Sequence, residues 1–371
     1  MKYQKLFLIP VLALTSMLSS CIGDSNGSSK STTISNNLAL VMTSDYQTGA
    51  LRWIATDSTT DSLSSASLSF NQDSKLVTIG ADLYILERSG ADNLVRIKTS
   101  ALPAASAVQY QVSLGNGANP SDLVIFDATT GWLALTGRDY LLRFNPTTGS
   151  AIDSIDLSAY NYSDSTSNPS TVALALYGDT LCVVMQRLNS WSPSAKGLVA
   201  LLNAKTGAIL DTISLKGNNP QAAILDGARL LIPNEGDLMD STTAASTRSL
   251  DVIDLKTGTV SVLATSTALG GAPGTVALDS KNRKLYVGVY HNWGTMPVAI
   301  IDADNGDILQ TSIEGVADAE GGMAFDTVSG SVFIGDRSST NGGLKIWNGT
   351  SLRTAPSGDA LPPLSIAIAN W

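Results

Sequence analysis

The stretch Gly271–Ile313, GAPGTVALDSKNRKLYVGVYHNWGTMPVAIIDADNGDILQTSI, contains four short apolar segments separated by polar turns. The segments are TVALD, KLYVGVY, PVAIID and ILQTSI, and Val, Ile and Tyr are prominent in them. Short runs of such residues between turn residues predict consecutive antiparallel strands. A four-stranded unit that recurs at about fifty residues is typical of one blade of a β-propeller.

Two sequence landmarks indicate that this unit recurs. The first is a polar loop before each leading strand, found at Asn119-Pro120-Ser121, Asn168-Pro169-Ser170, Asn219-Pro220-Gln221, Ala272-Pro273-Gly274 and Ala319–Gly322. The second is an Asn or Asp four residues before a Gly, found at Asn145–Gly149, Asn203–Gly207, Asp254–Gly258 and Asp302–Gly306. An Asn or Asp that opens a tight turn, with Gly at the position needing positive φ, predicts a hairpin. Segment 302–307 also resembles a calcium loop, but it is shorter than the twelve-residue pattern, and the turn is favoured.

The landmarks define six complete units and two partial ones. The complete units are 66–118, 119–167, 168–218, 219–271, 272–318 and 319–360. Residues 38–57 provide later strands without a leading strand, and residues 363–371 provide a leading strand alone. If Ser365–Asn370 forms the innermost strand of the first blade, the chain closes as an all-β, seven-bladed ring without free sheet edges. A six-bladed ring with frayed ends is the alternative.

The first residues predict export and a membrane anchor. Lys2 and Lys5 precede the apolar run LFLIPVLALTSML, so residues 1–20 are expected to be a signal peptide. Leu18-Ser19-Ser20-Cys21 looks like a bacterial lipobox, which implies a lipid on Cys21; an ordinary signal peptide with a chance cysteine is the alternative. Residues 21–37 are then a flexible tether, and residues 38–371 the propeller domain. Ile22 in place of Asp favours the outer membrane of the bacterial envelope.

Composition excludes several classes of function. The chain has 32 acidic and 23 basic residues, a net charge of −9, and no cluster of basic residues that would indicate a nucleic-acid partner. It has one histidine, His291, and two cysteines, Cys21 and Cys182. The usual zinc, catalytic-triad and nucleotide-binding motifs are not found, so no metal, no cofactor and no catalytic residue are predicted. A monomer is expected.

The ends of the second strands provide the candidate site. The apolar runs LVMTS, LYILER, LALTGR, LCVVMQ, LLIPNE, LYVGVY and VFIGDR align, and most of them end in a polar or charged residue. These residues and their neighbours are Arg88, Arg138, Gln186, Arg187, Glu235, Tyr290, His291, Trp293 and Arg337. In a propeller they would lie near the mouth of the central channel, where several arginines suit an anionic ligand. The structural alternative is that each arginine pairs with a carboxylate or binds backbone carbonyls.

The motifs KLYVGVY, AIIDADNGDIL and LDVIDLKTGTV and the loops GNNP and GGAP resemble those of the YVTN-type (YncE-like) seven-bladed propellers. The resemblance covers nearly all of residues 37–371 and implies a propeller fold without fixing a function. The favoured interpretation is a non-catalytic, membrane-anchored propeller that binds a small ligand or a partner protein. Trp191 and Trp293, in polar loops, are candidates for such contacts. The alternatives are an envelope assembly scaffold and a lactonase-like hydrolase, which would need Glu235, Glu320 and Asp336 to converge on a metal.

Overall fold

The computed structural model describes residues 36–59, 62–162, 168–189, 192–193, 195–237, 244–356 and 361–371. The predicted signal peptide, Cys21, almost all of the predicted tether and Trp191 lie outside the described residues. All described residues belong to one compact unit, Ile34–Trp371. No helix in the described part of the chain is long and apolar enough to cross a membrane.

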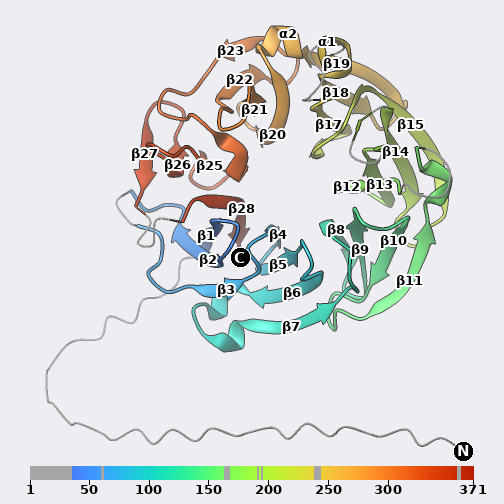
Figure 1. Ribbon diagram of the computed structural model, residues 1–371, viewed down its shortest axis with the longest axis horizontal. Coiled ribbons are helices and arrows are strands. Elements are labelled where there is room, and N and C mark those ends of the chain that lie inside the picture. Colours follow the sequence, from blue (N-terminus) through green and yellow to red (C-terminus); the bar gives the residue numbers. More distant parts are fainter. Residues whose placement is uncertain are drawn as a thin grey trace, which may run out of the picture. The chain divides into compact units, whose positions relative to one another are not determined.

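Seven four-stranded antiparallel sheets stand side by side in a ring around a central channel (Figure 1). From the channel outward, the first four sheets are β28(Pro363–Asn370), β1(Asn37–Ser44), β2(Gly49–Ala55), β3(Leu68–Phe70); β4(Ser74–Ile79), β5(Asp82–Glu87), β6(Asn93–Lys98), β7(Val108–Ser113); β8(Pro120–Asp127), β9(Thr130–Leu135), β10(Tyr140–Phe144), β11(Ala151–Asp156); and β12(Thr171–Tyr177), β13(Thr180–Met185), β14(Lys196–Asn203), β15(Ile209–Asn218). The remaining three are β16(Ile224–Asp226), β17(Arg229–Asn234), β18(Ser249–Asp254), β19(Thr259–Thr265); β20(Ala272–Asp279), β21(Lys284–Tyr290), β22(Val298–Asp302), β23(Ile308–Gln310); and β24(Met323–Asp326), β25(Ser331–Asp336), β26(Gly343–Trp347), β27(Leu352–Ala355). The short helices are η1(Thr99–Ala101), η2(Ala105–Ala107), η3(Ser158–Tyr160), α1(Ala244–Thr247), α2(Ser266–Leu269) and η4(Ala319–Gly321).

The predicted closure of the ring is confirmed. Strand β28 pairs antiparallel with β1, from Asn37 opposite Asn370 to Thr43 opposite Pro363. The ring therefore has seven blades, not six. One predicted boundary is wrong: Leu68–Phe70 was assigned to the unit 66–118 but pairs with β2 in the closing blade. The first full blade begins only after the turn at Asn71, whose side chain accepts a hydrogen bond from the Asp73 N–H at 2.8 Å.

The hydrophobic core consists of seven clusters, one between each pair of neighbouring blades. Alternate residues of each second strand face opposite neighbours. In β1, Leu40 packs toward β5 and Val41 packs toward β25. Because both faces of these strands are buried, they appear in the sequence as continuous apolar runs. Cys182 is one of these core residues, and burial raises the pKa of its thiol to about 12.

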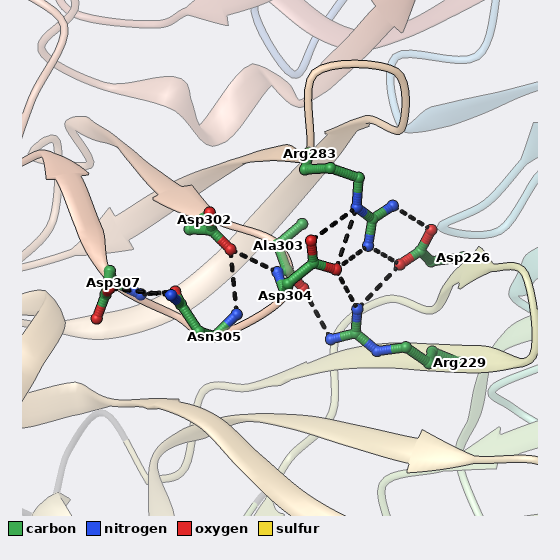
Figure 2. Close-up of polar contacts among 8 residues, drawn as sticks. All are labelled: Asp226, Arg229, Arg283, Asp302, Ala303, Asp304, Asn305 and Asp307. Atoms are coloured by element: carbon green, nitrogen blue, oxygen red, sulfur yellow. Dashed lines mark hydrogen bonds and ion pairs between the residues drawn. The ribbon is translucent and has the colours of Figure 1, made fainter.

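The recurring Asn/Asp-to-Gly segments form tight turns between the third and fourth strands, as predicted. Asn203 accepts hydrogen bonds from the N–H groups of Lys205 and Thr206 at 3.1 and 2.9 Å, and Gly207 has φ of 77°. The segment that begins at Asp302 forms the same turn, since the Asp302 carboxylate accepts from two following N–H groups. This confirms the turn for segment 302–307 (Figure 2).

Four charged side chains connect two neighbouring blades on the side of these turns (Figure 2). Both Nη atoms of Arg283 donate to the two carboxylate oxygens of Asp226, at 2.8 and 2.7 Å, and Nη2 also donates to Asp304 at 2.6 Å. Arg229 donates to the carbonyl oxygen of Ala303 at 2.7 Å and completes the cluster. A forked guanidinium shared by two carboxylates is stronger than an isolated surface ion pair.

We expect Arg283→Ala to destabilise the protein by about 1 kcal/mol at neutral pH, because it removes the shared partner of two carboxylates. The Arg283 guanidinium lowers the pKa of Asp226 and Asp304. A carboxyl whose pKa is lower in the folded state stabilises the fold above its unfolded pKa and loses this effect as the pH falls through the folded value. The difference between wild type and variant should therefore shrink below about pH 4. Chemical unfolding measures it, with exposed Lys281→Ala in the same turn as control; an equal effect of both changes would contradict the role of the cluster.

Candidate ligand site at the channel mouth

A cavity of about 850 Å³ occupies one end of the central channel. Every blade contributes to its wall, through the start of its innermost strand or the loop before it. The polar lining residues are Ser74, Lys75, Arg88, Asn119, Ser121, Thr136, Asn168, Ser170, Gln186, Gln221, Thr275, Glu320 and Ser365. A second volume of about 510 Å³ continues along the channel and shares Lys75, Leu76, Ala222 and Ile366 with the first. A volume of this size is typical of sites for small molecules.

Buried carboxylates hold the blade-start loops in place. Asp92, which is 1 % exposed, accepts hydrogen bonds from the N–H groups of Gly117 and Asn119, both at 2.7 Å. Asp251 accepts from the N–H groups of Lys216 and Gly217 at the end of β15, and Asp336 accepts from those of Ala317 and Asp318 just before η4. Carboxylate-to-amide hydrogen bonds of this kind fix a backbone that would otherwise be mobile. The cavity wall is therefore preformed by the fold.

The predicted arginines all lie near the mouth, but each has protein partners. Arg88 lines the cavity and forms an ion pair with Asp73. Arg138 donates to four carbonyl oxygens between residues 115 and 137, the shortest at 2.8 Å. Arg187 donates to the carbonyl oxygen of Tyr160 at 3.0 Å. These contacts match the structural alternative given for the arginines.

Arg337 connects the last blade to the closing blade. It donates to the carbonyl oxygens of Pro363 at 2.7 Å and Ser44 at 3.3 Å, and its guanidinium carbon lies 4.7 Å from the centre of the Tyr46 ring. Tyr46 is 49 % exposed and has φ of 64°. A large non-glycine residue in the left-handed region is strained, and such residues gather at binding sites. The sequence analysis missed Tyr46, although the preceding Asp45 and the following Gly49 mark a turn.

The other predicted residues separate into two groups. Gln186 is 8 % exposed, lines the cavity and donates to Asn219 Oδ1 at 2.8 Å. Tyr290, His291 and Trp293 are not among the lining residues. Tyr290 ends β21, and His291 and Trp293 belong to the loop between β21 and β22, where the His291 N–H donates to the Thr295 carbonyl at 3.0 Å and Trp293 is 80 % exposed. The structure thus brings Arg88 and Gln186 together at the cavity and places the aromatic loop outside it.

Two acidic side chains flank the start of β20, and one of them, Glu320, lines the cavity. The second, Glu235, does not line the cavity. A Cβ placed on the lining residue Gly274 would be 3.5 Å from Glu235 Oε1, so this carboxylate lies against a backbone that forms the cavity wall. Burial raises the pKa of Glu235 to about 7, with Arg248 opposing and Glu320 adding to the shift. Burial and the neighbouring Asp318 also raise the pKa of Glu320.

The described residues include no group of three or more His, Cys, Asp or Glu side chains that could hold a metal ion. The metal-dependent hydrolase required Glu235, Glu320 and Asp336 to converge. In the structure the Asp336 carboxylate accepts hydrogen bonds from the N–H groups of Ala317, Asp318 and Ser338 instead.

Sequence reasoning recognised the blade-start loops as landmarks but not as cavity lining. Asn119, Ser170 and Asn219 have φ of 48°, 52° and 55°. Asn119 and Ser170 line the cavity, and Asn219 accepts a hydrogen bond from the lining residue Gln186. Lys75 was missed because it lies within the innermost strand β4, where it contacts Asp122 at 3.6 Å. Only the ring geometry shows that this strand lines the channel.

These features define a seven-bladed β-propeller with a preformed polar cavity at one end of its channel. Among solved structures, a protein from Lactobacillus plantarum matches with a TM-score of 0.65 and 13 % identity, over 90 % of this chain and 99 % of the other. A functionally unknown protein from Desulfotomaculum acetoxidans matches with a TM-score of 0.62 and 14 % identity, over 90 % and 99 %. Hydrazine synthase from Kuenenia stuttgartiensis matches with a TM-score of 0.59 and 14 % identity, over 84 % and 95 %. At such identities the likeness supports the fold alone. No protein-family model and no curated protein sequence matches the chain.

Proposed function

We propose that this protein is a non-catalytic binding protein that captures a small polar ligand at the mouth of its channel. The observation that carries the proposal is the cavity of about 850 Å³, to which all seven blades contribute amide, hydroxyl and charged groups. Binding sites in ring-shaped folds use such a concave, preformed wall, because little ordering is then needed when the ligand enters. A small anion, as expected from Arg88, Arg138 and Arg337, is one ligand of this kind.

The predicted export signal supports a cellular location for the protein. We propose that the lipid on Cys21 anchors the protein in the bacterial cell envelope at the outer membrane, as LSSC followed by Ile22 predicts. A Cys21→Ser variant should then be recovered in the soluble fraction, whereas recovery of both forms with membranes would contradict the anchor.

Filling the channel tests the binding site. Ala222 lines both volumes of the channel, so an Ala222→Trp side chain would occupy the space between them. In a thermal-shift screen of small carboxylates, amines and sugars, we expect ligands that raise the Tm of the wild type to leave the variant unchanged. Because all seven sheets lie within residues 37–371, the screen uses a protein of residues 22–371. A ligand that stabilises both forms equally would contradict binding in the channel.

The exposed loop supports a second candidate, a protein partner held on the rim. Trp293 is 80 % exposed, and such a large apolar side chain is often an anchor in protein interfaces. In this case Trp293→Ala should release a partner that chemical crosslinking captures in cells, while Ala222→Trp should retain it. If Ala222→Trp releases the partner and Trp293→Ala retains it, binding at the channel is favoured.

A further inference from the structure

The charges around the cavity do not balance. Its two lining cations have their own carboxylates: Lys75 lies 3.6 Å from Asp122, and Arg88 forms an ion pair with Asp73. Asp122 is also fixed by the N–H of Leu174 at 2.9 Å. On this side of the channel two positive and two negative charges cancel. An added anion would have to compete with these carboxylates.

On the side formed by the start of β20 and by η4, the balance is negative. No described lysine or arginine is in ion-pair contact with Glu235 or Glu320. The nearby cations are Arg248 for Glu235 and Arg337 for Glu320, and both donate to backbone carbonyl oxygens. None of the described residues donates a hydrogen bond to the Glu235 carboxylate.

We infer that the channel mouth binds a small organic molecule carrying a protonated amine, which pairs with Glu320 on the cavity wall, while the Glu235 carboxylate adds negative charge from beside Gly274. The inference rests on the proposed function and gives the chemical class of its ligand. An ammonium group supplies a positive charge and hydrogen-bond donors, and no described residue gives these carboxylates an ion pair or a side-chain hydrogen bond. The remaining wall combines neutral amides and hydroxyls with the neutralised Lys75 and Arg88 and with apolar side chains such as Leu188, Met323 and Leu364, so it accommodates a remainder with both polar and apolar parts.

An organic cation fits this site better than a metal ion. The cavity of about 850 Å³ is far larger than an ion needs, and two carboxylates on different blades do not form a coordination shell. The described residues contain no group of three or more metal-ligating side chains. A partly buried carboxylate without a donor also reduces the stability of the empty protein, and proteins retain such groups mainly where they act on a ligand.

The test compares three probes of similar length and different charge: 1,5-diaminopentane, lysine and glutarate. Isothermal titration calorimetry with residues 22–371 at pH 8 should show binding of the diamine and of lysine and no binding of glutarate. In the double variant Glu235→Gln, Glu320→Gln, amine affinity should fall at least about tenfold, as expected for loss of charge-assisted hydrogen bonds. Glu314→Gln, an exposed glutamate in the same connection as Glu320, should retain wild-type affinity.

The pH dependence provides a second readout. Amine binding should weaken as the pH falls below 7, because Glu235 then becomes protonated. Binding of glutarate in place of the amines, or amine affinity unchanged in the double variant, would overturn the inference while leaving a ligand site in the channel. Failure of all three probes to bind would also overturn it. A ligand retained during purification and lost in Ala222→Trp would still support the proposed function in that case.

Discussion

Removal of residues 363–371 is expected to abolish the cooperative unfolding transition near the wild-type Tm. Strand β28 contributes to two of the seven core clusters, since Ala367 and Ala369 pack toward β4 and Ile366 packs toward the last blade. Its loss would also free the N–H of Leu76, which donates to Ser365 Oγ, and the hydroxyl of Thr78, which donates to the Ile368 carbonyl. The loss of one large buried side chain costs about 2–5 kcal/mol. The summed loss of several such side chains approaches the total stability of a domain.

Circular dichroism during heating measures the effect. Trp371→Ala is the control, because this side chain is 36 % exposed and lies after the last paired residue of β28. The control should change the Tm by only a few degrees. A truncated protein that unfolds cooperatively at the wild-type Tm would show that the ring does not depend on closure by β28.

Glu235→Gln is expected to stabilise the ligand-free protein by about 2–3 kcal/mol at pH 8. The folded protein holds the pKa of this carboxyl at about 7, well above its value of 4.5 in an unfolded chain. A carboxyl group whose pKa is raised in the folded state stabilises the fold fully below its unfolded pKa. This stabilisation is lost as the pH rises through the folded pKa. Glutamine resembles the protonated acid and avoids this loss.

The stability difference should therefore vanish at pH 4 and reach its full size above pH 7. Denaturant unfolding across this range measures it, with Glu314→Gln expected to show no such pH dependence. Equal stability of wild type and Glu235→Gln at pH 8 would indicate that the carboxylate is already well solvated or partnered. If Glu235→Gln both stabilises the protein and abolishes amine binding, the carboxylate lowers stability for the sake of ligand binding, as residues in binding sites commonly do.

The fold could be predicted from the sequence because each blade repeats the same local signals. Apolar runs mark second strands buried on both faces, and the Asn203–Gly207 type of turn marks the outer hairpin of four blades. Closure followed from two fragments that complete one blade. The boundary at Leu68–Phe70 was missed because this three-residue strand is too short to carry its own pattern.

The candidate site could be placed at the channel mouth but not described in detail. A strand-end pattern shows that Arg138 and Arg337 lie near the mouth, yet their carbonyl partners come from other loops and from residues far away in the sequence. In the same way, the pKa of Glu235 depends on burial by its surroundings in the fold, with contributions from Arg248 and Glu320. The strain at Tyr46 and the channel-facing position of Lys75 also result from the ring and not from local sequence.

Native mass spectrometry of residues 22–371, purified gently from the bacterial envelope or periplasm after expression without the anchor, shows whether the channel mouth holds a ligand. Binding at the channel mouth predicts that the protein retains a small molecule, which carries a basic nitrogen if the amine inference is correct, and that the Ala222→Trp variant, which fills the channel, retains none. A protein that retains no small molecule, or an adduct of equal abundance in the variant, would contradict a ligand site in the channel.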